Sequence, residues 1–204
     1  MRGQPDEATL LARVAQLDDA GRAQAPIFLP YLNGERTPHN NPQAQGVFFG
    51  LHSGHGAADL GWAVIEGVAF GLADGWRALG AAPGSVPALS LVGGGARSPL
   101  WAQLLADVLD MPLHTHPGGE AGGALGAARL GWLAHLGEQG VDEVQAEALV
   151  CTAPPVARRF EPRPAEQPAL AARQQRFAAL YRALQPLMGV LPVPAAAARA
   201  DHLG

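Results

Sequence analysis

The sequence of 204 residues contains no lysine and only one cysteine, Cys151. A P-loop needs a lysine after its glycines to reach the phosphates, so the missing lysine excludes that nucleotide site. A lone cysteine cannot form a disulfide within the chain, which suits a reducing compartment, and we expect a cytoplasmic protein. The sequence has no run of about 20 apolar residues, so we expect no membrane partner.

The chain has a low net charge and no long run of basic residues. The formal net charge is −4, from 14 basic and 18 acidic residues, which argues against a nucleic-acid partner. Hydrophobic residues make up 48% of the chain, which excludes a disordered protein. The composition therefore predicts a folded domain that acts on something other than nucleic acid or membrane.

Glycine is plentiful, and three glycines stand together in the segment LSLVGGGARS, residues 89–98. The pattern predicts a buried strand at Leu89–Val92, a glycine loop, an N-cap at Ser98 and a helix that begins at Pro99. Such a loop before a helix N-terminus is typical of phosphate and nucleotide sites. A tight strand-to-helix turn also needs glycine, so the local pattern leaves both interpretations open.

The glycine loop does not match the Rossmann fingerprint G-x-G-x-x-G. Gly93 and Gly95 fit its first two positions, but Ser98 stands where the third glycine belongs. The next predicted strand, Leu113–His116, is followed by Pro-Gly-Gly and not by the acidic residue that would bind a ribose. If the loop binds a nucleotide, the site is of another type.

The clearest predicted helix spans residues 57–79. We expect its apolar stripe to face the core, and Asp59 and Glu66 to lie on the polar side or near the helix start. Glycines recur every fourth residue, which predicts close approach of another backbone. The stripe comprises Leu60, Val64, Val68, Leu72, Trp76 and Leu79, and the glycines are Gly67, Gly71 and Gly75.

Further helices are predicted over 7–17, 122–135 and 169–188, and strands over 47–51 and 113–116. The helix 122–135 has a flat face of small residues, which either packs on a sheet or borders a flat ligand such as adenine; the first is commoner. Gln103 and Asp107 are expected to be surface or packing residues.

Two clusters of polar residues are candidate sites. His114 and His116 would share one face of a strand, but no further ligand supports a metal, and we assign none. Glu35, Arg36 and His39 lie in the polar loop 33–46. Arg36 could bind an anion, or an internal Glu35–Arg36 pair could hold the loop; the residues alone leave both open.

Three segments resemble, in order and spacing, segments of the xylulose kinases, members of the FGGY carbohydrate kinase family. They are PIFLPYLNGERTPHNNPQAQGVFFGL (26–51), GGGARSPLWAQLLADVLDMPL (93–113) and GGEAGGALGAARLG (118–131). The motif GERTPHNN, residues 34–41, is the most specific of them. The resemblance covers roughly residues 5–190.

The resemblance implies an α/β fold, a partial actin-like (ribonuclease H-like) ATPase domain that forms the C-terminal domain of an FGGY sugar kinase. It implies ATP with Mg²⁺ as cofactors and phosphorylation of D-xylulose to its 5-phosphate. No protein ligand to Mg²⁺ is assigned. The adenosine-binding residues carried over by motif are Gly94, Gly95 and Ala96, with Arg97 and Ser98 beside them.

Members of this family are more than twice as long as this chain, and their catalytic aspartate and sugar pocket lie upstream of the matching part. We therefore assign no catalytic residue and expect a C-terminal fragment, inactive alone, that meets D-xylulose only through a missing N-terminal domain. One alternative is a non-catalytic remnant or an interaction subunit that needs a separate N-terminal half or forms a homodimer. Another is a kinase for a different ketose.

The expected organisation has four parts. Residues 1–150 form the partial kinase domain with the adenosine segment. Residues 151–168, which contain five prolines, form a linker. Residues 169–188 form a C-terminal helix, and residues 189–204 form a disordered tail.

Overall fold

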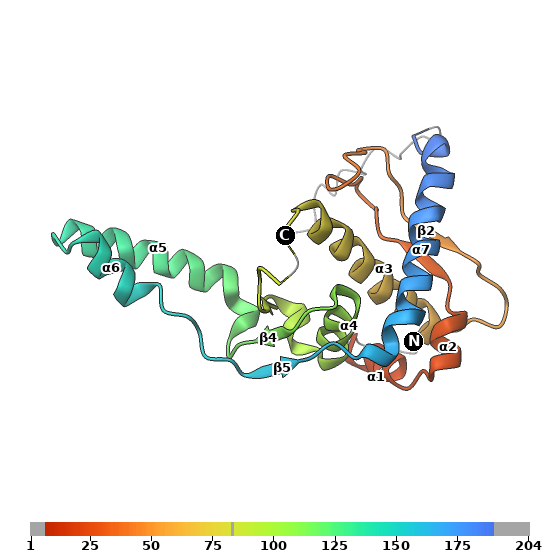
Figure 1. Ribbon diagram of the computed structural model, residues 1–204, viewed down its shortest axis with the longest axis horizontal. Helices are drawn as coiled ribbons and strands as arrows, with labels where there is room; N and C mark the ends of the chain where they lie inside the picture. The colour runs from red at the N-terminus through yellow and green to blue at the C-terminus, as the bar shows by residue number, and fades with distance from the viewer. Residues whose placement is uncertain (1–6, 83, 190–204) are drawn as a thin grey trace, which may run out of the picture. The chain divides into compact units, whose positions relative to one another are not determined.

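The computed structural model describes residues 7–82 and 84–189 (Figure 1). Its backbone contacts divide the chain into two compact units. Unit 1 comprises Met1–Ala78 and Ala172–Gly204, and unit 2 comprises Leu79–Ala171. No helix in the described part of the chain is long and apolar enough to cross a membrane. The tail expected at 189–204 lies outside the described residues except for Gly189.

Unit 1 combines a two-stranded antiparallel sheet with helices. Its strands pair in a register that places Phe28 opposite Phe48, and their rings stack at 4.3 Å. The first helix and the first strand both pack on the long third helix. The elements are α1 (Glu7–Ala15), α2 (Asp19–Gln24), β1 (Ile27–Leu29), β2 (Val47–Phe49), α3 (Ala57–Ala78), α7 (Gln167–Leu184, which crosses the division between the units) and the 3₁₀ turn η4 (Gln185–Leu187).

The α3 helix buries the side opposite to the predicted one. Val64, Leu72 and Leu79 of the expected core stripe are 37%, 50% and 71% exposed. The prediction failed because α3 meets strand β1 at Gly67, on the side opposite to the predicted stripe. A side-chain carbon added at Gly67 would collide with the carbonyl oxygen of Phe28. The buried face comprises Trp62, Ala63, Glu66, Gly67, Ala69, Phe70 and Ala73.

Close backbone approach, predicted for all three spaced glycines, is confined to Gly67. The nearest atom to an added carbon at Gly71 is a side-chain atom of Pro30 at 3.7 Å, an ordinary contact. At Gly75 no atom lies within 4 Å. The two positions Gly67 and Gly75 therefore differ sharply in what a larger side chain would meet.

Glu66 was predicted on the polar side of α3 or near its start, but it lies in the buried face, in the middle of the helix, and is 2% exposed. Its carboxylate accepts two hydrogen bonds of 2.6 Å from the guanidinium of Arg173 in α7. Arg173 also donates to the carbonyl oxygens of Ala23 and Ala25. Burial raises the pKa of Glu66, and the bonds from Arg173 oppose that rise. The pair joins α7 to α3 and to the end of α2.

Unit 2 is built on a three-stranded sheet in the order β3–β4–β5. Strands β3 and β4 are parallel, and β5 runs antiparallel to β4. Helices α5 and α6 pack on one another as a hairpin (Figure 1). The elements are β3 (Leu89–Ser90), η1 (Gly94–Arg97), α4 (Pro99–Leu109), β4 (Leu113–Thr115), η2 (Gly119–Ala121), α5 (Gly122–Glu138), α6 (Glu143–Val150), β5 (Arg158–Phe160) and η3 (Pro164–Glu166).

Three features of unit 2 differ from expectation. The strand predicted at 89–92 is only two residues long, and Val92 is 55% exposed instead of buried. The predicted linker 151–168 contains the strand β5 and the turn η3, because residues 158–160 pair with β4. Helix α5 has no buried residue, so its flat face is not packed on the sheet.

Substitution of Gly67 by alanine tests the contact of α3 with β1. We expect Gly67→Ala to lower the free energy of unfolding by about 1–3 kcal/mol, because β1 must move to admit the methyl group. Gly75→Ala is the matched control and should raise it by about 0.5–1 kcal/mol through helix propensity. Urea unfolding followed by circular dichroism measures both. Equal shifts for the two variants would contradict the assigned packing.

Candidate functional site

The glycine loop begins where β3 ends and runs directly into α4. Gly93 has φ +86°, a conformation that favours glycine, and residues 94–97 form the 3₁₀ turn η1. The hydroxyl oxygen of Ser98 accepts a hydrogen bond of 3.3 Å from the backbone N–H of Trp101. Pro99 is the first residue of the helix. The predicted N-cap and the predicted helix start are therefore both confirmed.

A second glycine turn, which follows β4, lies against the first. Because β3 and β4 are parallel, their carboxyl ends lie at one edge of the sheet, where ligands of open α/β sheets commonly bind. The backbone N–H of Gly93 donates to the carbonyl oxygen of Gly119 at 2.9 Å. Gly118 has φ +68°, and no side chain caps the α5 helix that follows. The repeated glycines of residues 118–123 are the only signal of this second turn in the sequence.

The five predicted adenosine-site residues, 94–98, are consecutive but differ in exposure and in the space beside their backbone. Gly94, Gly95 and Arg97 are exposed, while Ala96 and Ser98 are half-buried. An added carbon at Gly95 would lie 2.9 Å from the indole ring of Trp101. At Gly94 it would meet only a guanidinium nitrogen of Arg97, at 3.6 Å. Of the two predicted glycines, Gly94 therefore leaves more room beside its backbone than Gly95.

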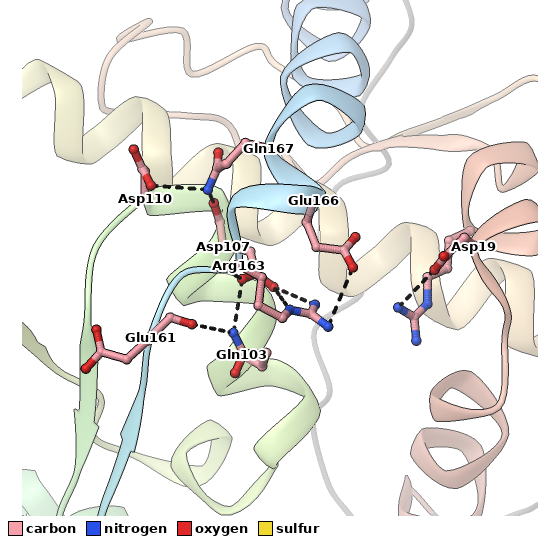
Figure 2. Close-up of polar contacts among 9 residues, drawn as sticks. Asp19, Gln103, Asp107, Asp110, Glu161, Arg163, Glu166 and Gln167 are labelled. Carbon is pink, nitrogen blue, oxygen red and sulfur yellow. Dashed lines mark hydrogen bonds and ion pairs between the residues drawn. The ribbon is translucent and has the colours of Figure 1, made fainter.

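Helix α4 is anchored by Asp107, which is completely buried. Of the two roles expected for it, surface or packing, the structure shows the packing role (Figure 2). One carboxylate oxygen accepts bonds of 3.1 and 2.6 Å from the guanidinium of Arg163. The other accepts the backbone N–H of Arg163 at 2.8 Å and the side-chain amide of Gln103 at 3.0 Å. Gln167 donates to the backbone carbonyl of Asp107. These bonds join the segment after β5 to the helix that starts at the glycine loop.

The GERTPHNN loop belongs to unit 1 and is held by Glu35, but not through the internal Glu35–Arg36 pair that was one of the two predictions. The Glu35 carboxylate accepts the backbone N–H of His39 at 2.7 Å and not the Arg36 guanidinium, and Arg36 is exposed. Two backbone hydrogen bonds join Glu35 and Asn41. The imidazole of His39 stacks on the ring of Tyr181 at 3.8 Å, and the Asn41 amide donates to the Tyr181 hydroxyl. Helix α7 therefore fixes the shape of this loop.

A ligand set for a metal ion is not seen in residues 7–82 and 84–189, where no three His, Cys, Asp or Glu side chains cluster. His114 lies in β4, and His116, just beyond it, bonds to the Ser90 hydroxyl and the Pro155 carbonyl oxygen. These two bonds give His116 a structural role in joining β4 to β3 and to the segment before β5.

A mixed sheet with a glycine loop at the carboxyl ends of two parallel strands defines an α/β domain of the kind that binds ligands at that edge. Residues 2–135 match the model of the C-terminal domain of the FGGY family of carbohydrate kinases. The chain belongs to this family, which confirms the predicted fold class.

The chain is similar to xylulose kinases in both sequence and structure. It is 43% identical over 189 residues to the xylulose kinase of Escherichia coli strain K12, a match that covers 92% of this chain and 37% of that protein. The solved xylulose kinase of Rhodospirillum rubrum is 30% identical, with a TM-score of 0.66, and the match covers 88% of this chain and 34% of that one. The chain therefore spans little more than a third of the length of these relatives.

The pairing of Asp107 can be tested by removing its main partner. Arg163→Met should lower the free energy of unfolding by about 3 kcal/mol, because a buried carboxylate loses its opposite charge. Glu166→Gln is the control: it removes only the 3.6 Å pair with the half-exposed Arg163 and should cost less than about 1 kcal/mol. Urea unfolding measures both. A loss for Glu166→Gln as large as that for Arg163→Met would contradict the assigned role of Asp107.

Proposed function

We propose that this chain supplies the adenosine wall of an ATP-dependent kinase that converts D-xylulose to D-xylulose 5-phosphate. The observation that carries the proposal is the exposed Gly94 backbone at the shared carboxyl edge of β3 and β4. The likeness to xylulose kinases over 92% of the chain supports the choice of sugar. In this proposal Gly94, Gly95 and Ala96 contact the adenosine, with Arg97 and Ser98 beside them.

The residues present fit a bound nucleotide. Gly94 has no side chain and is exposed, and a carbon added there would meet only a guanidinium nitrogen of Arg97 within 4 Å. Arg97, also exposed, carries a guanidinium that can stack on a base or bind a phosphate. ATP supplies the phosphoryl group when it is bound, and Mg²⁺ accompanies the nucleotide, with no protein ligand proposed in this chain. The catalytic aspartate and the sugar pocket are proposed to belong to further polypeptide.

Exposed apolar side chains support a requirement for that further polypeptide. In unit 1 they include Leu72 of α3, and in unit 2 Leu130 and Trp132 of α5, each at least half exposed. Contiguous patches of exposed apolar side chains mark interfaces between polypeptides. In this proposal these side chains contribute to a surface that an N-terminal part covers.

The requirement for a second part predicts the activity of the chain alone. With ATP, Mg²⁺ and D-xylulose, the purified chain should release no ADP above the rate without enzyme. Co-expression with the N-terminal two-thirds of the Escherichia coli xylulose kinase should restore turnover, measured by coupled ADP release. Glycerol and gluconate serve as control substrates, since relatives of the chain include kinases named for both. Xylulose-dependent turnover by the chain alone would refute the fragment interpretation.

Gly94→Val in the restored assembly tests the adenosine wall. The valine should raise KM for ATP about tenfold or more and leave KM for D-xylulose within about twofold, because it fills the space that the nucleotide needs. Gly95→Val should also weaken ATP binding, but its contact with Trp101 disturbs the loop as well.

Gly137→Val is the matched control for this test. Gly137 lies near the end of α5 with no atom within 4 Å of an added carbon, so neither KM should change. The melting temperature of each variant shows whether the fold is retained. A change in KM for the sugar alone in Gly94→Val would exclude the glycine loop as the nucleotide wall.

A further inference from the structure

A shallow, open hollow of about 450 Å³ lies in unit 1 beside the GERTPHNN loop. Pro38 and His39 of the loop form one side, and helices α3 and α7 supply the rest. The lining is part apolar and part charged: besides Pro38 and His39 it comprises Asp74, Arg77, Ala78, Ala178 and Arg182. None of these residues belongs to the glycine loop, which lies in unit 2.

Two of the charged residues in the hollow, Asp74 and Arg77, form an ion pair with each other. The Arg77 guanidinium donates to the Asp74 carboxylate at 2.9 Å and to the side-chain oxygen of Gln174 at 2.7 Å. Burial raises the pKa of Asp74, and the nearby charges of Arg77 and His39 oppose that rise. The negative charge of Asp74 is thus offset within the hollow and does not repel an anion strongly.

The other two polar residues leave donors open. Arg182 uses only its Nε atom, in a bond of 3.3 Å to the carbonyl oxygen of Ala178. Within the described ranges its terminal nitrogens have no acceptor. The His39 ring is held by stacking on Tyr181, with an interplanar angle of 16°, and by an edge contact with Tyr31. Neither ring nitrogen of His39 has a hydrogen-bond partner in the same part of the chain.

We propose that this hollow binds a tetrahedral oxyanion, held by the Arg182 guanidinium and the His39 imidazole. A guanidinium presents a planar fork of donors that matches such an anion, and an imidazole N–H adds a further donor. The hollow is larger than a bare oxyanion requires, and its apolar wall of Pro38, Ala78 and Ala178 suits the carbon skeleton of a phosphorylated small molecule. The inference does not depend on the nucleotide site.

Calorimetric titration of the full chain with sulfate tests the proposal, because sulfate is fully ionised near neutral pH. Saturable binding at fixed ionic strength is expected, with affinity reduced about tenfold or more in Arg182→Gln and in His39→Phe. The phenylalanine keeps the stacking on Tyr181 and removes both ring nitrogens. Arg176→Gln is the matched control: Arg176 is an exposed arginine of α7 outside the hollow, and its loss should change affinity less than twofold.

The wild-type spectrum gives an independent readout. Sulfate should also shift the NMR signals of Arg182 Nε–H and the His39 ring, which needs no variant.

Comparison of ligands identifies the source of the oxyanion. Ribose 5-phosphate that binds more tightly than inorganic phosphate would indicate a phosphorylated metabolite, and equal affinities would indicate the free anion. Ribose that binds as tightly as ribose 5-phosphate would overturn the proposal. So would the absence of saturable sulfate binding to the wild type, or an equal loss of affinity in Arg176→Gln.

Discussion

A carboxylate removed from water must be paired with a cation, and this constraint ties the C-terminal segment to both units. Asp107 in α4 and Glu66 in α3 are buried, and each accepts two guanidinium hydrogen bonds. Their partners, Arg163 and Arg173, lie close together in sequence near and within α7. The family model ends at residue 135, so both carboxylates lie inside the matched range and both arginines beyond it. The buried carboxylates of the matched range therefore require the segment that follows this range, because it supplies their arginine partners.

The same segment shapes the GERTPHNN loop. Tyr181 of α7 stacks on His39 and accepts a hydrogen bond from Asn41, so the loop is fixed by contacts far away in the sequence. Glu35 closes the loop from within by accepting the backbone N–H of His39. The conformation of this most specific motif is therefore determined by α7 and by an internal carboxylate-to-backbone bond, and Arg36 takes no part in it.

The glycine loop in unit 2 depends on local geometry. Gly93 provides the turn with positive φ, and Ser98 caps α4. Asp107 fixes that helix through its hydrogen bonds to Arg163. The loop is completed only by the second turn at Gly118–Gly119, which parallel pairing of β3 and β4 brings to the same edge. Local sequence thus builds half of the candidate site, and sheet topology brings the other half to it.

Signals carried by a few neighbouring residues were sufficient to determine the turn at Gly93, the cap at Ser98, the start of α4 and the positions of the main helices, because backbone conformation and capping are local. Family membership also followed from motifs. The buried side of α3, the pairing of Asp107 and Glu66, and the strand at Arg158–Phe160 followed only from tertiary structure. Large apolar residues predicted the wrong face of α3, since Gly67 allows β1 to approach where no large side chain would fit. Burial and ion pairing depend on which segments meet in space, and a pattern read along one helix carries no record of its partner.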